Sequence, residues 1–171
     1  MTVPEGLSIR PTSDRVRQAI FNVLGQFFDG ERVLDLFAGS GAMGLEALSR
    51  GAGRLTLVEQ DREAIRAIEA NLRMLGWEER ARVVRGDVGA FLRSAGGDFD
   101  LVFVDPPYEI SPAPYLVALG TLALPAGARV VVEHEARFRP EDRYGNLQRR
   151  ESRRYGVTSV SFYEAGSEEA P

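Results

Sequence analysis

The stretch VLDLFAGSGAMGLEALSRGA, residues 33–52, constrains the fold more than any other part of the chain. An apolar run that suits a buried strand ends in Gly39-x-Gly41-x-x-Gly44, and a helical pattern follows at once. Glycines at this spacing let the chain turn tightly between a strand and a helix, and they let a ligand approach the backbone. Because any tight strand–helix turn favours small residues, the pattern indicates a ligand-binding loop only when its surroundings agree.

Strand and helix patterns alternate after this loop. The expected strands are 54–61, 81–87, 99–108 and 128–135, and the expected helices are 62–76, 88–95 and 113–122. This alternation predicts parallel βαβ units with right-handed crossovers, and therefore an α/β, doubly wound sheet with helices on both faces. A closing strand within residues 153–164 follows a turn instead of a helix, so we expect it to run antiparallel.

The start of the chain predicts a helix over residues 12–28, capped by Thr12 or Ser13. The positions expected on its buried face are Val16, Ile20, Val23, Leu24 and Phe27. Residues 1–30 are expected to form an N-terminal segment and helix, and residues 164–171 a mobile acidic tail. Both belong to one predicted domain that spans residues 1–171.

Composition narrows the class of protein. The chain has 171 residues, and 44% of them are apolar, which suits one domain with a sizeable core. It shows neither an apolar run long enough for a transmembrane helix nor a signal-peptide pattern. The absence of cysteine excludes disulfides and thiolate metal sites, and it fits a cytoplasmic protein.

The charge pattern is uneven. The net charge of −4 argues weakly against a nucleic-acid partner. However, all 21 basic residues are arginine, and seven of them lie between Arg137 and Arg154 against three acidic residues. Arginine binds phosphate bidentately and stacks on bases, so this segment is a candidate contact for nucleic acid.

Acidic residues near the ends of the first three strands after the N-terminal helix indicate the type of ligand. Glu59 follows Gly39 by twenty residues, where a doubly wound fold places an acid against ribose hydroxyls. Asp87 either binds an adenine edge or caps the helix that follows. Asp35, just before the glycine loop, would repel a pyrophosphate but suits an ammonium group, directly or through water. Together these acids favour S-adenosylmethionine over NAD(P) as the cofactor.

The strand LVFV ends in Asp105-Pro106-Pro107-Tyr108, at the sheet edge where such folds carry their chemistry. The Asp105 carboxylate and the Pro106 carbonyl can accept both N–H groups of an exocyclic amine and aim its lone pair at a methyl group. Two prolines fix the turn, and Tyr108 offers a flat face to a base taken out of its stack. We therefore predict a catalytic turn at residues 105–108 that needs no metal. His134, the one histidine, is expected to be structural or exposed.

At these residues the chain resembles S-adenosylmethionine-dependent amino-methyltransferases with a [DNS]-P-P-[YFW] motif, and more closely the RsmD family of 16S ribosomal RNA (guanine-N2)-methyltransferases. The stretches that carry the resemblance are RPTSDRVRQAIFNVL, VLDLFAGSGAMGLEALSRGA, FDLVFVDPPYE and RRYGVTSVSFYE. The resemblance implies a Rossmann-like methyltransferase fold, with a mostly parallel seven-stranded sheet and one antiparallel strand near the C-terminus. It also implies a cofactor site formed by Asp35, Gly39, Gly41, Glu59 and Asp87.

The family resemblance further implies a substrate and partners. These are 16S ribosomal RNA or a small ribosomal subunit particle, methylated during subunit assembly by a cytoplasmic monomer. Residues 10–12 and Asn22 would lie near the methionine end of the cofactor or the substrate. Members of the family usually carry a basic stretch before this segment, whereas MTVPEGLSI precedes Arg10 here. The arginines of residues 10–17 and 137–154 are therefore expected to make much of the phosphate contact.

Other functions remain open on the residues alone. Adenine-N6 methylation of DNA uses a closely similar turn, and glutamine-amide methylation of a protein is a third methyl transfer. An NAD-dependent oxidoreductase would explain the glycine loop but not the DPPY turn. A non-catalytic RNA-binding module would not need both the cofactor site and the DPPY turn.

Overall fold

The computed structural model describes residues 14–167. Its strands are β1 (Arg32–Leu36), β2 (Arg54–Glu59), β3 (Ala81–Arg85), β4 (Leu101–Val104), β5 (Arg129–Glu135), β6 (Arg143–Tyr144), β7 (Leu147–Tyr155) and β8 (Thr158–Ala165). Its helices are α1 (Asp14–Leu24), α2 (Ala42–Ser49), α3 (Arg62–Leu75), the 3-10 turn η1 (Glu78–Arg80), α4 (Val88–Ser94) and α5 (Ala113–Thr121). Thr12 and Ser13, the expected caps of the first helix, lie outside the described residues.

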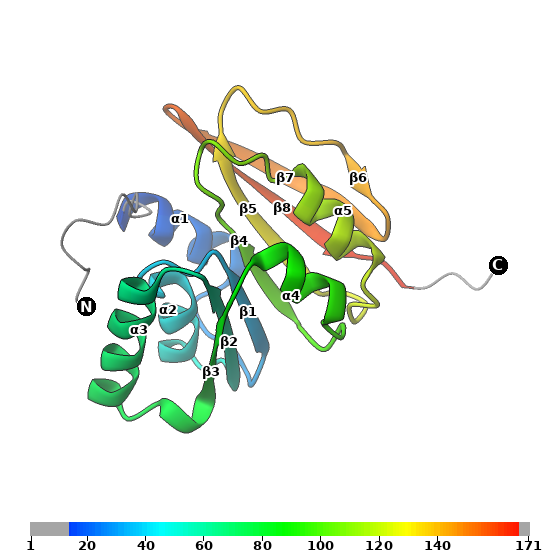
Figure 1. Cartoon of the computed structure of the whole chain (residues 1–171). Helices are drawn as coiled ribbons and strands as arrows, with labels where there is room; N and C mark the ends of the chain where they lie inside the picture. Colours follow the sequence, from blue (N-terminus) through cyan, green and yellow to red (C-terminus); the bar gives the residue numbers. More distant parts are fainter. Residues whose placement is uncertain (1–13, 168–171) are drawn as a thin grey trace.

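All eight described strands form one sheet in the order β3-β2-β1-β4-β5-β8-β7-β6 (Figure 1). The first five strands in this order are parallel, and β8 pairs antiparallel with β5. This confirms the doubly wound α/β sheet with an antiparallel strand near the C-terminus. The chain order reverses between β1 and β4, which opens a crevice at the carboxyl ends of these strands.

The predicted number of seven strands is wrong by one. β7 pairs with β8, and the short β6 pairs with β7, both in antiparallel fashion. The sequence of β7 is LQRRESRRY, and only Leu147 in it is buried. Such a strand is held by backbone hydrogen bonds to β8, so it lacks the apolar alternation from which strands are predicted.

Two hydrophobic cores cover the two faces of the sheet. One packs buried residues of α1, α2 and α3 against the strands, among them Phe21, Leu48 and Ile68. The other packs buried residues of α4 and α5, such as Leu92 and Leu116, together with residues of the β6–β7 region. The helices therefore lie on opposite sides of the sheet (Figure 1).

Helix α1 is shorter than the sequence predicts. It ends at Leu24, because Gly25 takes a left-handed φ of 107° and breaks the helical phase. The Leu24 carbonyl accepts a hydrogen bond of 2.7 Å from the guanidinium of Arg129 in β5, which ties the helix end to the sheet. Phe27 consequently leaves the buried face: its side chain is 88% exposed, contrary to the prediction, whereas Phe28 is buried.

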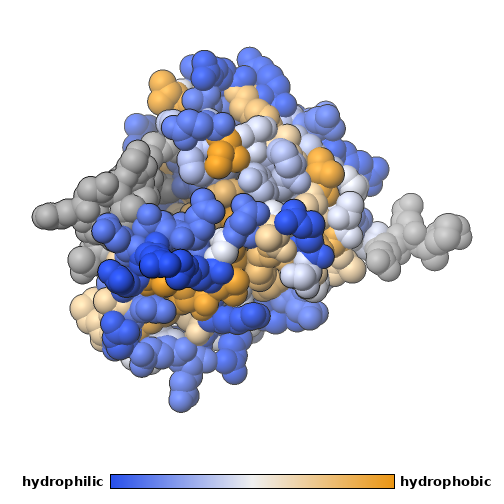
Figure 2. Space-filling view, viewed as in Figure 1, coloured by the Kyte–Doolittle hydropathy of each residue, from blue (hydrophilic) through white to orange (hydrophobic). Residues whose placement is uncertain are grey.

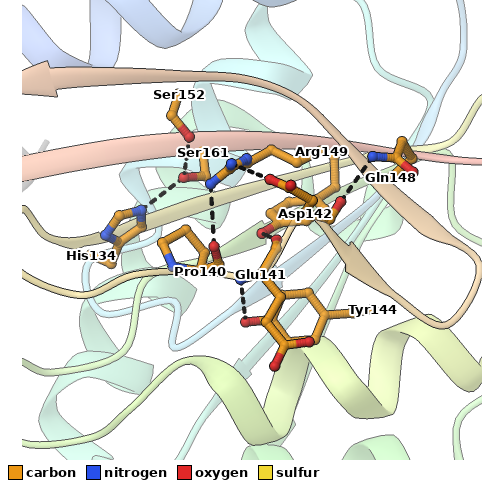
Figure 3. Close-up of polar contacts among 10 residues, drawn as sticks. His134, Pro140, Glu141, Asp142, Tyr144, Gln148, Arg149, Ser152 and Ser161 are labelled. Atoms are coloured by element: carbon orange, nitrogen blue, oxygen red, sulfur yellow. Dashed lines mark hydrogen bonds and ion pairs between the residues drawn. The ribbon is translucent and has the colours of Figure 1, made fainter.

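Arg149 of β7 and Tyr163 of β8 join the C-terminal strands to the loop that precedes β6. Figure 3 shows the contacts of Arg149. The guanidinium of Arg149 donates to the Pro140 carbonyl at 3.2 Å and pairs with the Asp142 carboxylate. The Tyr163 hydroxyl donates to the Glu141 carbonyl at 2.6 Å. Arg149, one of the seven arginines expected to contact phosphate, therefore has a structural role.

The chain remains ordered past residue 164. β8 includes Glu164 and Ala165, and the Gly166 amide donates to the Asn146 carbonyl at 3.0 Å. The expected mobile tail therefore does not begin at residue 164, and residues 168–171 lie outside the described part. Within residues 14–167, none of the helices has the length and apolar character needed to cross a membrane.

The ring of Phe21 should be a main source of stability for α1. It is fully buried, and its ring centroid lies 6.1 Å from that of Phe28 and 6.0 Å from that of Phe103 in β4. We expect Phe21→Ala to lower the free energy of unfolding by about 3–5 kcal/mol in urea denaturation. Phe27→Ala, the matched control on an exposed ring, should change it by less than about 0.5 kcal/mol. Equal losses in the two variants would contradict the placement of α1.

Candidate functional site

Each of the five parallel strands has an acidic residue near its carboxyl end, within two residues before or after the last residue of the strand. In the spatial order β3-β2-β1-β4-β5 these residues are Asp87, Glu59, Asp35, Asp105 and Glu133. The fold therefore converts acids that are spread over about a hundred residues of sequence into one row along the sheet edge. The sequence pattern predicts the first four of them as site residues but not Glu133.

A cavity of about 560 Å³ opens at this edge. Except for Gly41, every residue predicted for the cofactor site and the catalytic turn lines it. The cavity runs from Asp87 after β3 to the turn after β4, so it crosses four neighbouring strands. Its size and mixed polar and apolar walls suit a ligand as large as a nucleoside with a side chain.

The glycine loop shapes the floor of this cavity. Gly39 and Gly41 take left-handed φ angles of 57° and 80°, which L side chains rarely adopt. A Cβ atom at Gly44 would lie 2.6 Å from the Leu55 side chain, so the glycine lets α2 pack closely on β2. Gly41 faces Leu57 and Ile68, so it forms the turn instead of lining the cavity.

Phe37, directly after β1, is a residue of the site that sequence analysis missed. It has a φ of 60°, which is uncommon for any residue except glycine and frequent at functional sites. Its ring packs edge to face on Tyr115 of α5, with centroids 4.9 Å apart, and both rings line the cavity. The sequence does not indicate this φ angle, because phenylalanine normally takes a negative φ.

The side chain of Asp35, near the end of β1, reaches the first turn of α2. Its side chain is 3% exposed, and its Oδ2 accepts a hydrogen bond of 3.0 Å from the Gly44 amide. Burial raises the pKa of Asp35 from its ordinary value of 3.8 to about 8, although the Gly44 amide lowers it; the negative charge of Glu59 raises it further. A cation bound beside Asp35 would offset this burial by favouring the ionised carboxylate.

Glu59 is held by three backbone amides. Its Oε2 accepts from the Gly39 amide at 2.8 Å, and its Oε1 accepts from the amides of Gln60 and Asp61 at 3.0 and 3.1 Å. The carboxylate is therefore fixed at the cavity wall before any ligand arrives. A carboxylate has about four lone-pair sites. The three amides leave one of them, on Oε2, for a ligand hydroxyl.

Asp87 serves as a cap and also lines the cavity. Its Oδ1 accepts from the Ala90 amide at 2.9 Å, which caps α4. It faces the cavity at the end farthest from Asp105. The capping role that the sequence left open is therefore observed, and it does not exclude contact with a ligand edge.

Helix α1 adds a cation to the cavity wall. Arg17 lines the cavity and pairs with Asp14 at 2.8 Å. Asn22, by contrast, is exposed, accepts a hydrogen bond from Gln26 at 2.6 Å and does not line this cavity. Its place near the methionine end of the cofactor or the substrate stays a prediction. Residues 10–12 lie outside the described part of the chain.

The DPPY turn closes the other end of the cavity. The Ile110 amide donates to the Pro107 carbonyl at 2.9 Å, which makes a tight turn behind the two prolines. The Tyr108 hydroxyl shares a hydrogen bond of 2.9 Å with Thr158 at the start of β8, and 40% of the tyrosine remains exposed. The tyrosine ring is therefore held from β8 while part of it stays open to a ligand.

A second cavity of about 300 Å³ lies on the other side of this turn and shares residues 106–110 with the first. His134 lines it, but its Nδ1 is 2.8 Å from the Glu135 carbonyl and its Nε2 is 2.8 Å from the Ser161 hydroxyl. Both ring nitrogens thus have protein partners, as expected for a structural histidine. Among residues 14–167, no three acidic or histidine side chains are grouped as a metal site.

The first cavity fits an ammonium-bearing nucleoside better than a dinucleotide. In dinucleotide-binding folds a pyrophosphate binds at the first turn of the helix after the glycine loop. Here the buried Asp35 carboxyl already accepts the Gly44 amide in that turn. A pyrophosphate would have to approach this acid, whereas an ammonium group would be attracted to it.

The family model described as "Conserved hypothetical protein 95" matches residues 1–164. "Putative rRNA methyltransferase YlbH" from Bacillus subtilis (strain 168) is 39% identical over 166 residues, which cover 92% of this chain and 89% of that protein. "Ribosomal RNA small subunit methyltransferase D" from Escherichia coli (strain K12) is 45% identical over 109 residues, which cover 64% of this chain and 54% of that protein. This match spans about half the length of the Escherichia coli relative.

A solved structure also matches most of the chain. The structure described as "Putative methyltransferase yhhF from Escherichia coli" has a TM-score of 0.87 and 35% sequence identity. The match covers 98% of this chain and 92% of that one. The similarity therefore extends over most of the fold, the sheet included.

The buried carboxyl of Asp35 should lower the free energy of unfolding at the pH values where it is ionised and no ligand is bound. Its folded pKa lies above its ordinary value, so the free energy of unfolding should fall as pH rises from about 4 to about 8. Asp35→Asn removes the titration and can keep the Gly44 hydrogen bond. We expect its thermal midpoint at pH 8 to exceed that of the wild type by several degrees.

The same variant should lose affinity for S-adenosylmethionine by at least about tenfold in calorimetry, because an amide attracts an ammonium group less than a carboxylate does. Asp29→Asn, at an exposed position outside the cavity, is the control and should match the wild type. A variant with unchanged affinity and a lower midpoint would show that Asp35 is structural only.

Proposed function

Since the chain belongs to the family described as "Conserved hypothetical protein 95", which confirms the resemblance to the RsmD family, we propose that it methylates ribosomal RNA. In the finer form of the proposal, it transfers a methyl group from S-adenosylmethionine to the exocyclic N2 amine of a guanine in 16S ribosomal RNA. The names of the relatives support the RNA class and the small subunit. The row of acids and the DPPY turn support the cofactor and the type of acceptor.

The order of the acids along the sheet edge carries the proposal. S-adenosylmethionine has an adenine, a ribose diol and a methionine with an ammonium group, and its methyl group is on the sulfur between ribose and methionine. The proposed partners in the same order are Asp87, Glu59 and Asp35, on three neighbouring strands. Gly39 and Gly41 form the loop that lets the ligand approach the backbone. The next acid along the edge is Asp105, on the strand beside that of Asp35. In the proposal, the methyl group projects from the sulfur toward Asp105.

The DPPY turn would activate the acceptor amine. S-adenosylmethionine supplies an electrophilic methyl group on a positively charged sulfur. Asp105 and the Pro106 carbonyl would each accept one N–H of the amine and aim its lone pair at that methyl group. The nitrogen lone pair forms the new N–C bond as the S–C bond breaks, the sulfur keeps the electron pair of the broken bond, and the nitrogen releases a proton to water. Pro107 would stiffen the turn, and Tyr108 would stack on the base.

The alternatives fit the site less well. The turn alone does not distinguish guanine N2 from adenine N6. A test with RNA and DNA acceptors is therefore needed to separate ribosomal RNA methylation from DNA adenine methylation. An NAD-dependent oxidoreductase conflicts with the Asp35 carboxyl, which accepts the Gly44 amide in the first turn of α2, where a pyrophosphate would bind. The monomeric state, the cytoplasmic location and the timing of methylation during subunit assembly stay predictions.

The surface supports a polar partner. On the face seen in Figure 2, polar side chains predominate in the described part, and hydrophobic residues lie in separate areas between them. Exposed arginines on β7, such as Arg150 and Arg153, also pair with Glu164 and Glu151. Phosphate contacts in this region would therefore compete with existing ion pairs, and binding should weaken as salt increases.

The acceptor test uses tritiated S-adenosylmethionine with small ribosomal subunits from an unmethylated strain, naked 16S ribosomal RNA and DNA. We expect label in the small-subunit RNA and little in DNA. Label confined to DNA would contradict the proposal, and so would the absence of transfer to every acceptor.

Asp105→Asn should lower the rate of methyl transfer by about 100-fold or more, because an amide orients the amine less well and does not stabilise its developing positive charge. Its affinity for S-adenosylmethionine in calorimetry should stay within about threefold of the wild type. Asp98→Asn, whose side chain is 91% exposed, is the control and should keep the wild-type rate. Normal turnover in Asp105→Asn would exclude the catalytic assignment of the turn.

A further inference from the structure

Glu133 extends the row of acids by one strand beyond the catalytic turn. β4 and β5 pair in parallel, with Val104 opposite Val132. The next position on each strand brings Asp105 level with Glu133, on backbones about 5 Å apart.

The two side chains also lie on the same face of the sheet. Side chains alternate along a strand, so Asp105 shares a face with Phe103, and Glu133 shares a face with Val131. Phe103 and Val131 belong to the same hydrophobic core, which places both acids on the side of α1 and α2. Glu133 is only 6% exposed, so its carboxylate is largely shielded from bulk solvent.

The second cavity makes Glu133 accessible from the far side of the turn. Residues 106–110 form its shared wall with the cofactor cavity, and Glu133 and Phe138 line it as well. The Phe138 ring packs edge to face on His134 at 5.3 Å, and it is half-buried. With a volume of about 300 Å³ and aromatic rings in its wall, this cavity suits a planar base next to the amine-binding turn.

The bases differ at the atom beside the reactive amine. In guanine, the N2 amine is next to N1–H, so two donors lie side by side on the Watson–Crick edge. In adenine and cytosine, the ring nitrogen next to the amine has no hydrogen and is an acceptor. A carboxylate level with Asp105 would accept from N1–H of guanine, and it would repel the ring nitrogen of the other two bases.

We propose that Glu133 binds N1–H of the acceptor base while Asp105 binds its amine, and that Glu133 thereby selects guanine. The inference rests on the proposed function, because it requires the DPPY turn to hold the amine. Glu135, the next residue on the same face of β5, pairs with Arg137 at 2.5 Å and lies one pleat further out. Glu133 is therefore the acid that is level with the amine site.

A base analogue separates recognition of N1–H from the chemistry at N2. Methylated residues of the small-subunit RNA are first mapped by mass spectrometry. Small subunits are then assembled with 16S ribosomal RNA that carries either guanine or 2,6-diaminopurine at the mapped position. The analogue keeps the 2-amino group but has no hydrogen on N1. We expect the wild-type protein to prefer guanine by at least about tenfold in kcat/KM.

Glu133→Gln should reduce this preference to about threefold or less, because an amide can offer either its oxygen or its NH₂ group to N1. Glu164→Gln, a carboxylate at the opposite end of the β5–β8 pair, is the control and should keep the wild-type preference. Calorimetry with S-adenosylmethionine checks that each variant is folded and binds the cofactor.

Two results would overturn the inference. Equal rates of the wild-type protein on guanine and on the analogue would do so without any variant. A Glu133→Gln protein that loses activity on both bases equally and keeps the preference would show a structural role. Failure of the wild-type protein to methylate either RNA would instead contradict the proposed function itself.

Discussion

The hydrogen bond between the Asp35 carboxyl and the Gly44 amide connects the fold to the chemistry. It joins the end of β1 to the first turn of α2 across the glycine loop at 3.0 Å, and the Asp35 side chain is only 3% exposed. The loop conformation, the close packing of α2 on β2 and the place of the acid in the cavity all meet at this contact. The contact buries an ionisable group, and burial disfavours the charged carboxylate. A cation that binds beside Asp35 would stabilise the charged form.

The parallel sheet turns this local contact into an extended site. The chain visits the acids in the order Asp35, Glu59, Asp87, Asp105 and Glu133, but the sheet places β1 between β2 and β4. The first three acids then extend to one side of the switch point, and the last two extend to the other. One side suits a cofactor with a nucleoside and an ammonium group, and the other suits an acceptor amine and the ring atom next to it. The reactive methyl group would lie at the junction.

Much of this arrangement could be predicted from the sequence. Hydrophobic periodicity and the glycine loop predict the parallel strands, and strand ends predict the positions of Asp35, Glu59 and Asp105. The rest depends on information that a residue pattern does not contain. Strand β7 is charged and is held by backbone pairing, Phe37 takes its unusual angle from the loop around it, and Arg17 reaches the cavity only because α1 packs across the sheet. The proposed role of Glu133 depends on the register between β4 and β5, which places it level with Asp105. The sequence of either strand alone does not show this register.

Proton release on cofactor binding tests the central role of Asp35 most directly. At pH 6.5 the free protein should hold Asp35 in its neutral form, because its pKa is raised to about 8. Binding of the charged ammonium group should ionise it, so calorimetry in buffers of different ionisation enthalpy should report release of about one proton per S-adenosylmethionine bound. Methylthioadenosine, which lacks the ammonium group, should bind with almost no release. Binding of S-adenosylmethionine without proton release would contradict the account.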